Sequence, residues 1–352
     1  MAQPIDSKRP GFAMFAARQR AACGAEAAWS IALFRVDDPP HVAEPAHPPR
    51  APGADGRRRV ALSWPLVPDF VRRSPIALQQ SPRATLPLIL VGPILRRLTP
   101  QRLVLWLVTS QPLEFRLCLF RRGAAAPFVS ERISGALLQR IRVGEAAFVQ
   151  LIDLSLAEPL PGDEVVEYDL RTPMADGEKG LADLLPHLIY RGEQRPSFVV
   201  RVRLDRLLHG SCRKPHYPSA DALLRVDALL SENPGKARQR PALLMMTGDQ
   251  AYADDVAGPM LVAIHQVVRR LGLFPEKLDG ALVADSDALY VHADSYYRRQ
   301  ELLPHTQAGR RLRELFFAGV KKPIFTADTA HNHLITLAEV VAMYLLVWSP
   351  QL

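Results

Sequence analysis

Residues 115–120 read Phe-Arg-Leu-Cys-Leu-Phe, and this alternating run decides the fold of the middle of the chain. Successive side chains of a strand point to opposite faces, so Phe115, Leu117 and Leu119 are expected to share one face. Similar short runs occupy residues 86–95, 103–109, 147–156, 164–170 and 198–204, with turn residues between them. Short strands without intervening long helices predict an antiparallel β-sandwich, which we place at residues 85–203.

The segment before the sandwich has a different composition. Twelve of the 31 prolines fall in residues 1–85, and this segment contributes +5 of the net charge of +8. Proline removes backbone donors, and no strand or helix period persists here, so we predict a disordered tail over residues 1–84. Within it, the Ala-rich stretch 12–35 is a candidate for a short helix. No nucleic-acid-binding motif accompanies the basic residues, so specific nucleic-acid recognition is not expected.

Composition also narrows the class of protein. Hydrophobic content of 48% is that of a globular chain, and three cysteines are too few for a disulfide scaffold. No uncharged apolar stretch reaches the roughly 18 residues that a transmembrane helix needs. No convincing signal peptide is visible, so we expect a cytoplasmic protein.

From residue 204 to 352 strands and helices alternate, which predicts an α/β unit. Residues 242–246 read Ala-Leu-Leu-Met-Met and predict a short buried strand. Helices are predicted over 220–230, with Ser219 as the cap, over 255–271, with Gly272 as the stop, and over 334–348. The class predicted for the whole chain is therefore α+β multidomain.

Two loops after predicted strands carry the reactive side chains. The first contains Cys212 and Arg213, and a thiol beside cations ionises more readily than a free one. The second contains Asp249 and Tyr252 directly after the apolar run 242–246. Ligand sites of α/β sheets lie at the carboxyl ends of their strands, so these loops form the candidate site. Asp254 and Asp255 are ambiguous, and we favour a role in capping the next helix.

Residues 210–214 and 248–255 resemble the corresponding motifs of the PhoD-like phosphatases, the alkaline phosphatase D group of metallophosphoesterases. Residues 332–335 and 343–350 are similar to a later segment of that family, and residues 91–96 and 104–106 to its fibronectin-III-like sandwich. The resemblance implies that Cys212, Asp249 and Tyr252 bind iron(III), with calcium at a second site that shares Asp249. Other divalent metals are alternatives.

The same resemblance implies hydrolysis of a phosphomonoester or phosphodiester substrate. Thiolate and phenolate suit a trivalent transition metal, whereas oxygen ligands suit calcium. Arg213 is the candidate catalytic side chain, steering the phosphate, and Lys214 shares this role as a candidate. The alternative for either cation is a solvated loop charge.

One difference from the family limits this interpretation. Its later Asp-Asp-His block is not found before Leu352, so we expect residues 204–352 to form an incomplete α/β metallophosphoesterase sandwich. The alternative function is therefore that of an inactive member acting as a binding or interaction protein. His331, Asn332 and His333 are interpreted as capping or structural residues. An incomplete sheet leaves apolar surface available for a partner or self-association. The helix residues expected to be uncovered are Leu337, Val341, Leu345 and Trp348.

Overall fold

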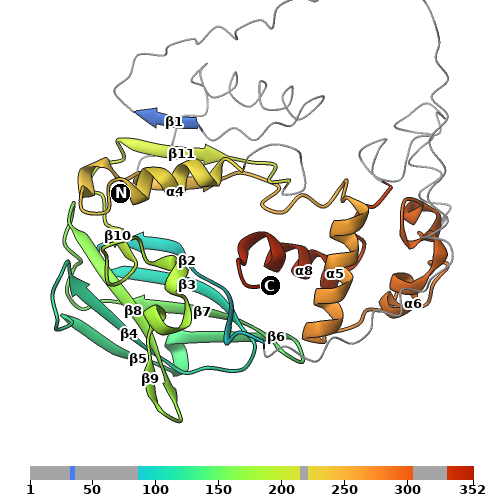
Figure 1. The fold of residues 1–352 in the computed structure, drawn as a ribbon, viewed down its shortest axis with the longest axis horizontal. Coiled ribbons are helices and arrows are strands. Elements are labelled where there is room, and N and C mark those ends of the chain that lie inside the picture. Colours follow the sequence, from blue (N-terminus) through green and yellow to red (C-terminus); the bar gives the residue numbers. More distant parts are fainter. Residues whose placement is uncertain (1–31, 36–85, 215–220, 304–330) are drawn as a thin grey trace, which may run out of the picture.

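The computed structural model describes residues 32–35, 86–214, 221–303 and 331–352. The rest of the predicted tail, with most of its candidate helix, lies outside these residues. The described chain is a mixed α+β structure with antiparallel sheets and few helices (Figure 1). None of its described helices combines the length and hydropathy needed to span a bilayer.

Two antiparallel sheets form the first part of the structure. The first sheet has the order β2 (Ile89–Thr99), β3 (Arg102–Thr109), β7 (Ala147–Ser155), β6 (Leu138–Gly144). The second has the order β10 (Ser197–Val199), β8 (Val165–Met174), β4 (Phe115–Arg121), β5 (Val129–Ile133), and β9 (Gly177–Lys179) also pairs with β8. One hydrophobic cluster joins side chains of both sheets, so the two antiparallel sheets pack against each other, as the predicted sandwich requires.

The alternation in β4 is realised as predicted on one face. Phe115, Leu117 and Leu119 all lie in the core between the two sheets. Phe120 points to the other face and is buried as well, because the Arg195 guanidinium lies 3.9 Å from its ring centroid.

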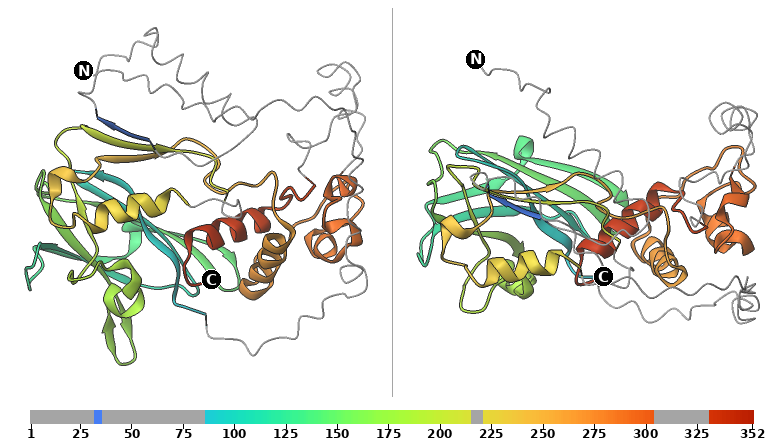
Figure 2. Two further views of the ribbon diagram at one scale, coloured as in Figure 1. Left: turned by 45° about the horizontal axis from the view of Figure 1, so that its top comes forward. Right: turned by 90° about the horizontal axis from the view of Figure 1, so that it is seen from above.

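The second part consists of helices that pack on the first sheet. They are α5 (Gly258–Leu271), α6 (Ser286–Val291) and α8 (Leu337–Trp348). Their apolar residues form one cluster with Leu90, Val91, Val108 and Ala147 of the sandwich. Figure 2 shows α5 and α8 beside the sandwich from two further sides. The sandwich and these helices therefore share a core.

The limits of α5 correct one prediction and confirm another. The helix ends at Gly272, whose φ of 56° is the left-handed conformation that glycine adopts at low cost. It begins at Gly258, three residues later than expected, with Ala257 as the cap. Asp254 and Asp255 therefore do not cap it. The turn between β6 and β7 reaches the end of α5, where Glu145 and Ala146 donate backbone hydrogen bonds of 2.9 Å to the carbonyls of Gly272 and Leu271.

A third, smaller sheet has the order β1 (Ala32–Arg35), β11 (Arg206–Gly210), β12 (Leu243–Met246). β11 and β12 are parallel and α4 (Leu223–Ser231) lies between them in sequence, which is the predicted strand–helix–strand order. Ser219 lies outside the described residues. β1 pairs antiparallel with β11, so these four residues form a strand rather than the end of the helix considered for 12–35. Pairing to a distant strand here overrides local helix propensity.

Two expectations about exposure are wrong. β12 was predicted to be buried, yet Leu243, Leu244 and Met245 are 41%, 39% and 41% exposed. Conversely, Leu345 on α8 is buried in the helical cluster, although Leu337 at the start of that helix is exposed as expected.

The α8 helix begins at Leu337 rather than at 334, because Thr336 and Glu339 form a capping box.

The remaining elements are short. They are α3 (Leu181–Leu184) and the 3-10 helices Gly135–Leu137, Pro186–Leu188, Ala237–Gln239, Ala293–Ser295 and Arg299–Leu302.

Candidate functional site

The parallel pair β11–β12 brings the two candidate loops together. Gly210 is the register partner of Met246, so both loops leave the sheet at the same edge. Backbone hydrogen bonds continue past the strands, from Cys212 N to Gly248 O at 3.1 Å and from Arg213 N to Asp249 O at 2.7 Å. Backbone hydrogen bonds alone therefore hold the two loops side by side.

Cys212 and Asp249 lie in contact at this edge. The Cys212 Sγ donates to Asp249 Oδ2 at 3.3 Å. Both residues have positive φ, 55° and 44°, and only four non-glycine residues of the described chain do so. A residue other than glycine in this left-handed backbone conformation costs about 1–3 kcal/mol, and such residues cluster at functional sites. The main chain thus adopts a costly conformation at both residues, and their thiol and carboxylate are side by side.

Tyr252 joins the same pair of loops through its backbone. Its N–H donates to Arg213 O at 2.9 Å, and the Lys214 Nζ lies 5.5 Å from its ring centroid. Lys214 also forms a salt bridge of 2.7 Å with Asp255. The three residues expected to bind metal therefore come from one small region, and Cys212 and Asp249 are in direct contact.

Arg213 is fixed rather than solvated. Its Nε and Nη2 donate to Asp221 Oδ2 at 3.2 and 2.7 Å, and its guanidinium lies 4.4 Å from the ring centroid of Trp348. The side chain is only 12% exposed, so a solvated loop charge is the wrong description. The Nη1 atom is buried and has no hydrogen-bond partner in the described protein. An unpaired buried donor of this kind is costly unless an acceptor reaches it.

The polar residues around these loops have structural contacts. The His333 Nε2 lies 3.5 Å from Asp254 Oδ1, and His209 Nε2 lies 2.9 Å from Thr247 Oγ1. Asn332 is buried and its Oδ1 accepts from Tyr297 N, while the His331 carbonyl accepts from Arg299 N at 3.2 Å. These contacts agree with the structural role expected for residues 331–333, and the cap of α8 is Thr336 rather than one of them.

The donor set fits one transition metal better than a pair of metals. Within the described residues no group of three or more His, Cys, Asp and Glu side chains gathers closely enough to hold an ion. If Tyr252 joins Cys212 and Asp249 as expected, thiolate, carboxylate and phenolate together would suit iron or another transition ion. For the implied calcium site, the described residues supply no comparable set of oxygen ligands beyond Asp249.

A buried charged network behind α8 was not predicted from the sequence. Glu339 is fully buried, and its carboxylate accepts from Arg299 Nη2 at 2.6 and 2.8 Å and from the backbone of Ile335 and Thr336. His265 Nε2 lies 2.7 Å from the same carboxylate. The capping box at Thr336 and Glu339 is visible in the sequence, but its distant partners Arg299 and His265 are not.

The ionisation states in this network follow from its geometry. Burial alone would raise the pKa of Glu339, but the hydrogen bond from His265 and the charge of Arg299 lower it to about 2. Burial lowers the pKa of His265, more than the nearby carboxylate raises it. A neutral His265 then donates from Nε2 to Glu339, and its Nδ1 accepts from the Tyr296 hydroxyl at 3.1 Å. Arg299 and Glu339 therefore carry the charges, and the histidine is neutral.

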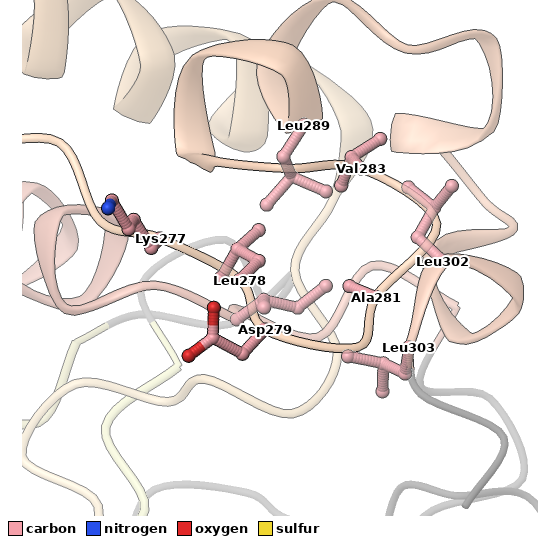
Figure 3. A pocket seen from close by; sticks show the side chains of 9 residues that line it. Lys277, Leu278, Asp279, Ala281, Val283, Leu289, Leu302 and Leu303 are labelled. Atoms are coloured by element: carbon pink, nitrogen blue, oxygen red, sulfur yellow. The ribbon is translucent and has the colours of Figure 1, made fainter.

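A separate cavity of about 240 Å³ lies near α6 (Figure 3). Its walls are mainly aliphatic, with Lys277 and Asp279 as the charged residues among those that line it. Neither of the candidate loops contributes to it, and its lining contains no histidine or cysteine. Figure 3 shows Leu278, Leu289 and Leu302 on different sides of this cavity, and we assign it no role in the chemistry of the candidate site.

Comparisons of the chain with protein-family models, with curated proteins and with solved structures give no match.

Proposed function

We propose that this chain hydrolyses phosphate esters through a metal held by Cys212, Asp249 and Tyr252, as a PhoD-like metallophosphoesterase with a fibronectin-III-like sandwich. One observation carries the proposal. A thiol and a carboxylate meet at 3.3 Å, both on left-handed backbone, where two parallel strands end. Their pairing places a thiol and a carboxylate side by side, and both can serve as anionic metal ligands.

The residues support a division of roles. A metal ion bound there would supply positive charge to a phosphoryl group and so favour its transfer to water. Arg213 is held beside Cys212 by Asp221 and Trp348, so its unpaired Nη1 can donate to a phosphate oxygen without a large loss of side-chain entropy. Lys214 is bound by Asp255 and is the weaker candidate for this role.

The test compares two cysteines. The purified chain is analysed for bound metal by mass spectrometry and for hydrolysis of nitrophenyl phosphate, beside Cys212→Ala and Cys118→Ala. Cys118 is buried in the sandwich, 3.7 Å from Ser130 Oγ, and serves as the matched control. We expect Cys212→Ala to lose both metal and turnover, and Cys118→Ala to keep both. Metal content unchanged in Cys212→Ala would refute the site, and a metal-loaded chain without turnover would refute the enzymatic function.

A binding or interaction protein is the second candidate function. It is favoured by the uncovered β12 strand and by the absence of a third His, Cys, Asp or Glu ligand among the described residues. Under this alternative the chain would be inactive on phosphate esters even when saturated with iron or calcium. The same turnover measurement therefore separates the two candidates.

A further inference from the structure

Among the described residues, β12 is an edge strand whose apolar side chains are partly exposed on both faces. It is the last strand of its sheet, so its outer backbone groups have no neighbouring strand in the described part of the chain. Leu243 and Met245 point to one face and Leu244 to the other, and each is about 40% exposed. Neither hydrophobic cluster includes a residue of β12. An apolar edge of this kind is a template for pairing with another strand.

Other edge strands of the described structure are protected by charge, whereas β12 is not. Arginines stand in the edge strands β2, β5 and β6. β10 is only three residues long. β12 reads Leu-Leu-Met-Met and contains no charge and no proline. Charged or very short edge strands are how proteins avoid unwanted pairing, and β12 has neither protection.

We propose that two copies of the chain form a dimer by pairing their β12 strands antiparallel across a two-fold axis. With the axis at the Leu244 position, Leu244 lies opposite the partner's Leu244, and Leu243 opposite the partner's Met245, so the members of each pair share a face of the sheet. Each cross-strand pair then joins apolar side chains, and no like charges meet. A second copy fits because the strand is complementary to itself, whereas a charged partner segment would find no counter-charge on it.

The sheet order also limits the size of the assembly. In the small sheet, β1 covers one edge of β11 and β12 covers the other. Two-fold pairing uses the β12 edge of each copy, which leaves the two β1 strands at the ends of a six-stranded sheet. An isologous contact of this kind closes on itself, so the assembly stops at the dimer.

Sedimentation velocity of the full chain over a hundredfold range of concentration tests the proposal directly. We expect a reversible equilibrium between monomer and dimer. A monomer at every concentration would overturn the proposal, whether or not the chain binds some other partner. Assemblies that grow beyond the dimer would overturn the closed two-fold arrangement.

Substitutions test the strand and its register. Both copies of a two-fold dimer carry the substitution Leu244→Lys, so the interface would contain two lysines. We therefore expect the dissociation constant of the dimer to rise by about 100-fold or more. Ile141→Lys is the matched control, because Ile141 is an exposed apolar residue on the edge strand β6 and is expected to leave dimerisation unchanged. Circular dichroism and urea midpoints confirm that each variant is folded. A persistent Leu244→Lys dimer contradicts the proposal.

A mixing experiment keeps the register falsifiable even though single variants do not dimerise. Leu244→Glu is also expected to be monomeric. When it is mixed with Leu244→Lys, the lysine of one copy faces the glutamate of the other, and the remaining pairs stay apolar. We expect a heterodimer to form that weakens with salt. Folded variants that fail to associate on mixing would overturn the proposed register.

Discussion

Removing the charge of Glu339 is the sharpest perturbation that the structure offers. In Glu339→Gln the shape is kept, but the amide brings N–H donors to a place surrounded by donors from Arg299, His265 and the backbone. Arg299 then stays buried with no negative partner among its described contacts. Breaking a buried ion pair in this way costs about 3–5 kcal/mol, which is a large part of the ~5–15 kcal/mol by which native domains are stable.

Urea unfolding followed by circular dichroism measures this loss as a lower midpoint at an unchanged slope. Glu114→Gln is the control, because its ion pair with Arg132 is more than half exposed on both sides and is worth about 0–1 kcal/mol. In the double variant Arg299→Met with Glu339→Leu, no charge is left unpaired, so we expect much of the stability to return. A Glu339→Gln protein no less stable than Glu114→Gln would refute the reasoning.

Three further predictions concern pH, packing and the candidate site. The free energy of unfolding should fall below about pH 6.5, because the unfolded chain protonates His265 more readily than the folded one. It should fall further below about pH 4.5, because Glu339 has a pKa of about 2 in the folded chain and is protonated first in the unfolded one. Urea midpoints measured across this pH range test both steps. Gly144→Ala should cost about 1–3 kcal/mol in urea unfolding, because a Cβ there would lie 2.9–3.0 Å from backbone atoms after α5; an unchanged midpoint would contradict this contact. Trp348→Leu should raise the inhibition constant of inorganic phosphate about tenfold through loss of the stack on Arg213, and an unchanged constant would remove Arg213 from phosphate binding.

The fold was predictable from sequence where side chains repeat with a clear period. Phe115, Leu117 and Leu119 alternate and therefore identify β4. Strands β5 and β6 carry mostly exposed polar and charged residues, so no apolar period marks them, and their pairing is determined by β4 and β7. β1 was not predicted because its partner β11 lies about half the chain away.

The candidate site was predictable only in its local part. Two loops that follow parallel strands must leave the same edge, which is why Cys212 and Asp249 were expected to be neighbours. The fixed position of Arg213 was not predictable, because it depends on Trp348, 135 residues away in the sequence. The exposure of β12 was not predictable either, because an apolar run reads the same whether or not another element covers it.

The parallel register of β11 and β12 has a consequence for which changes in chain length this protein tolerates. The connection between Ser231 and Leu243 lies outside both strands, so extra residues there leave the pairing of Gly210 with Met246 intact. An extra residue between Gly210 and Cys212, or between Met246 and Asp249, advances one loop by about 3.3 Å relative to the other. That step is as large as the 3.3 Å between the thiol and the carboxylate. The lengths of the two short segments after the strands are therefore constrained by the contact between Cys212 and Asp249, whereas the length of the connection between Ser231 and Leu243 can vary.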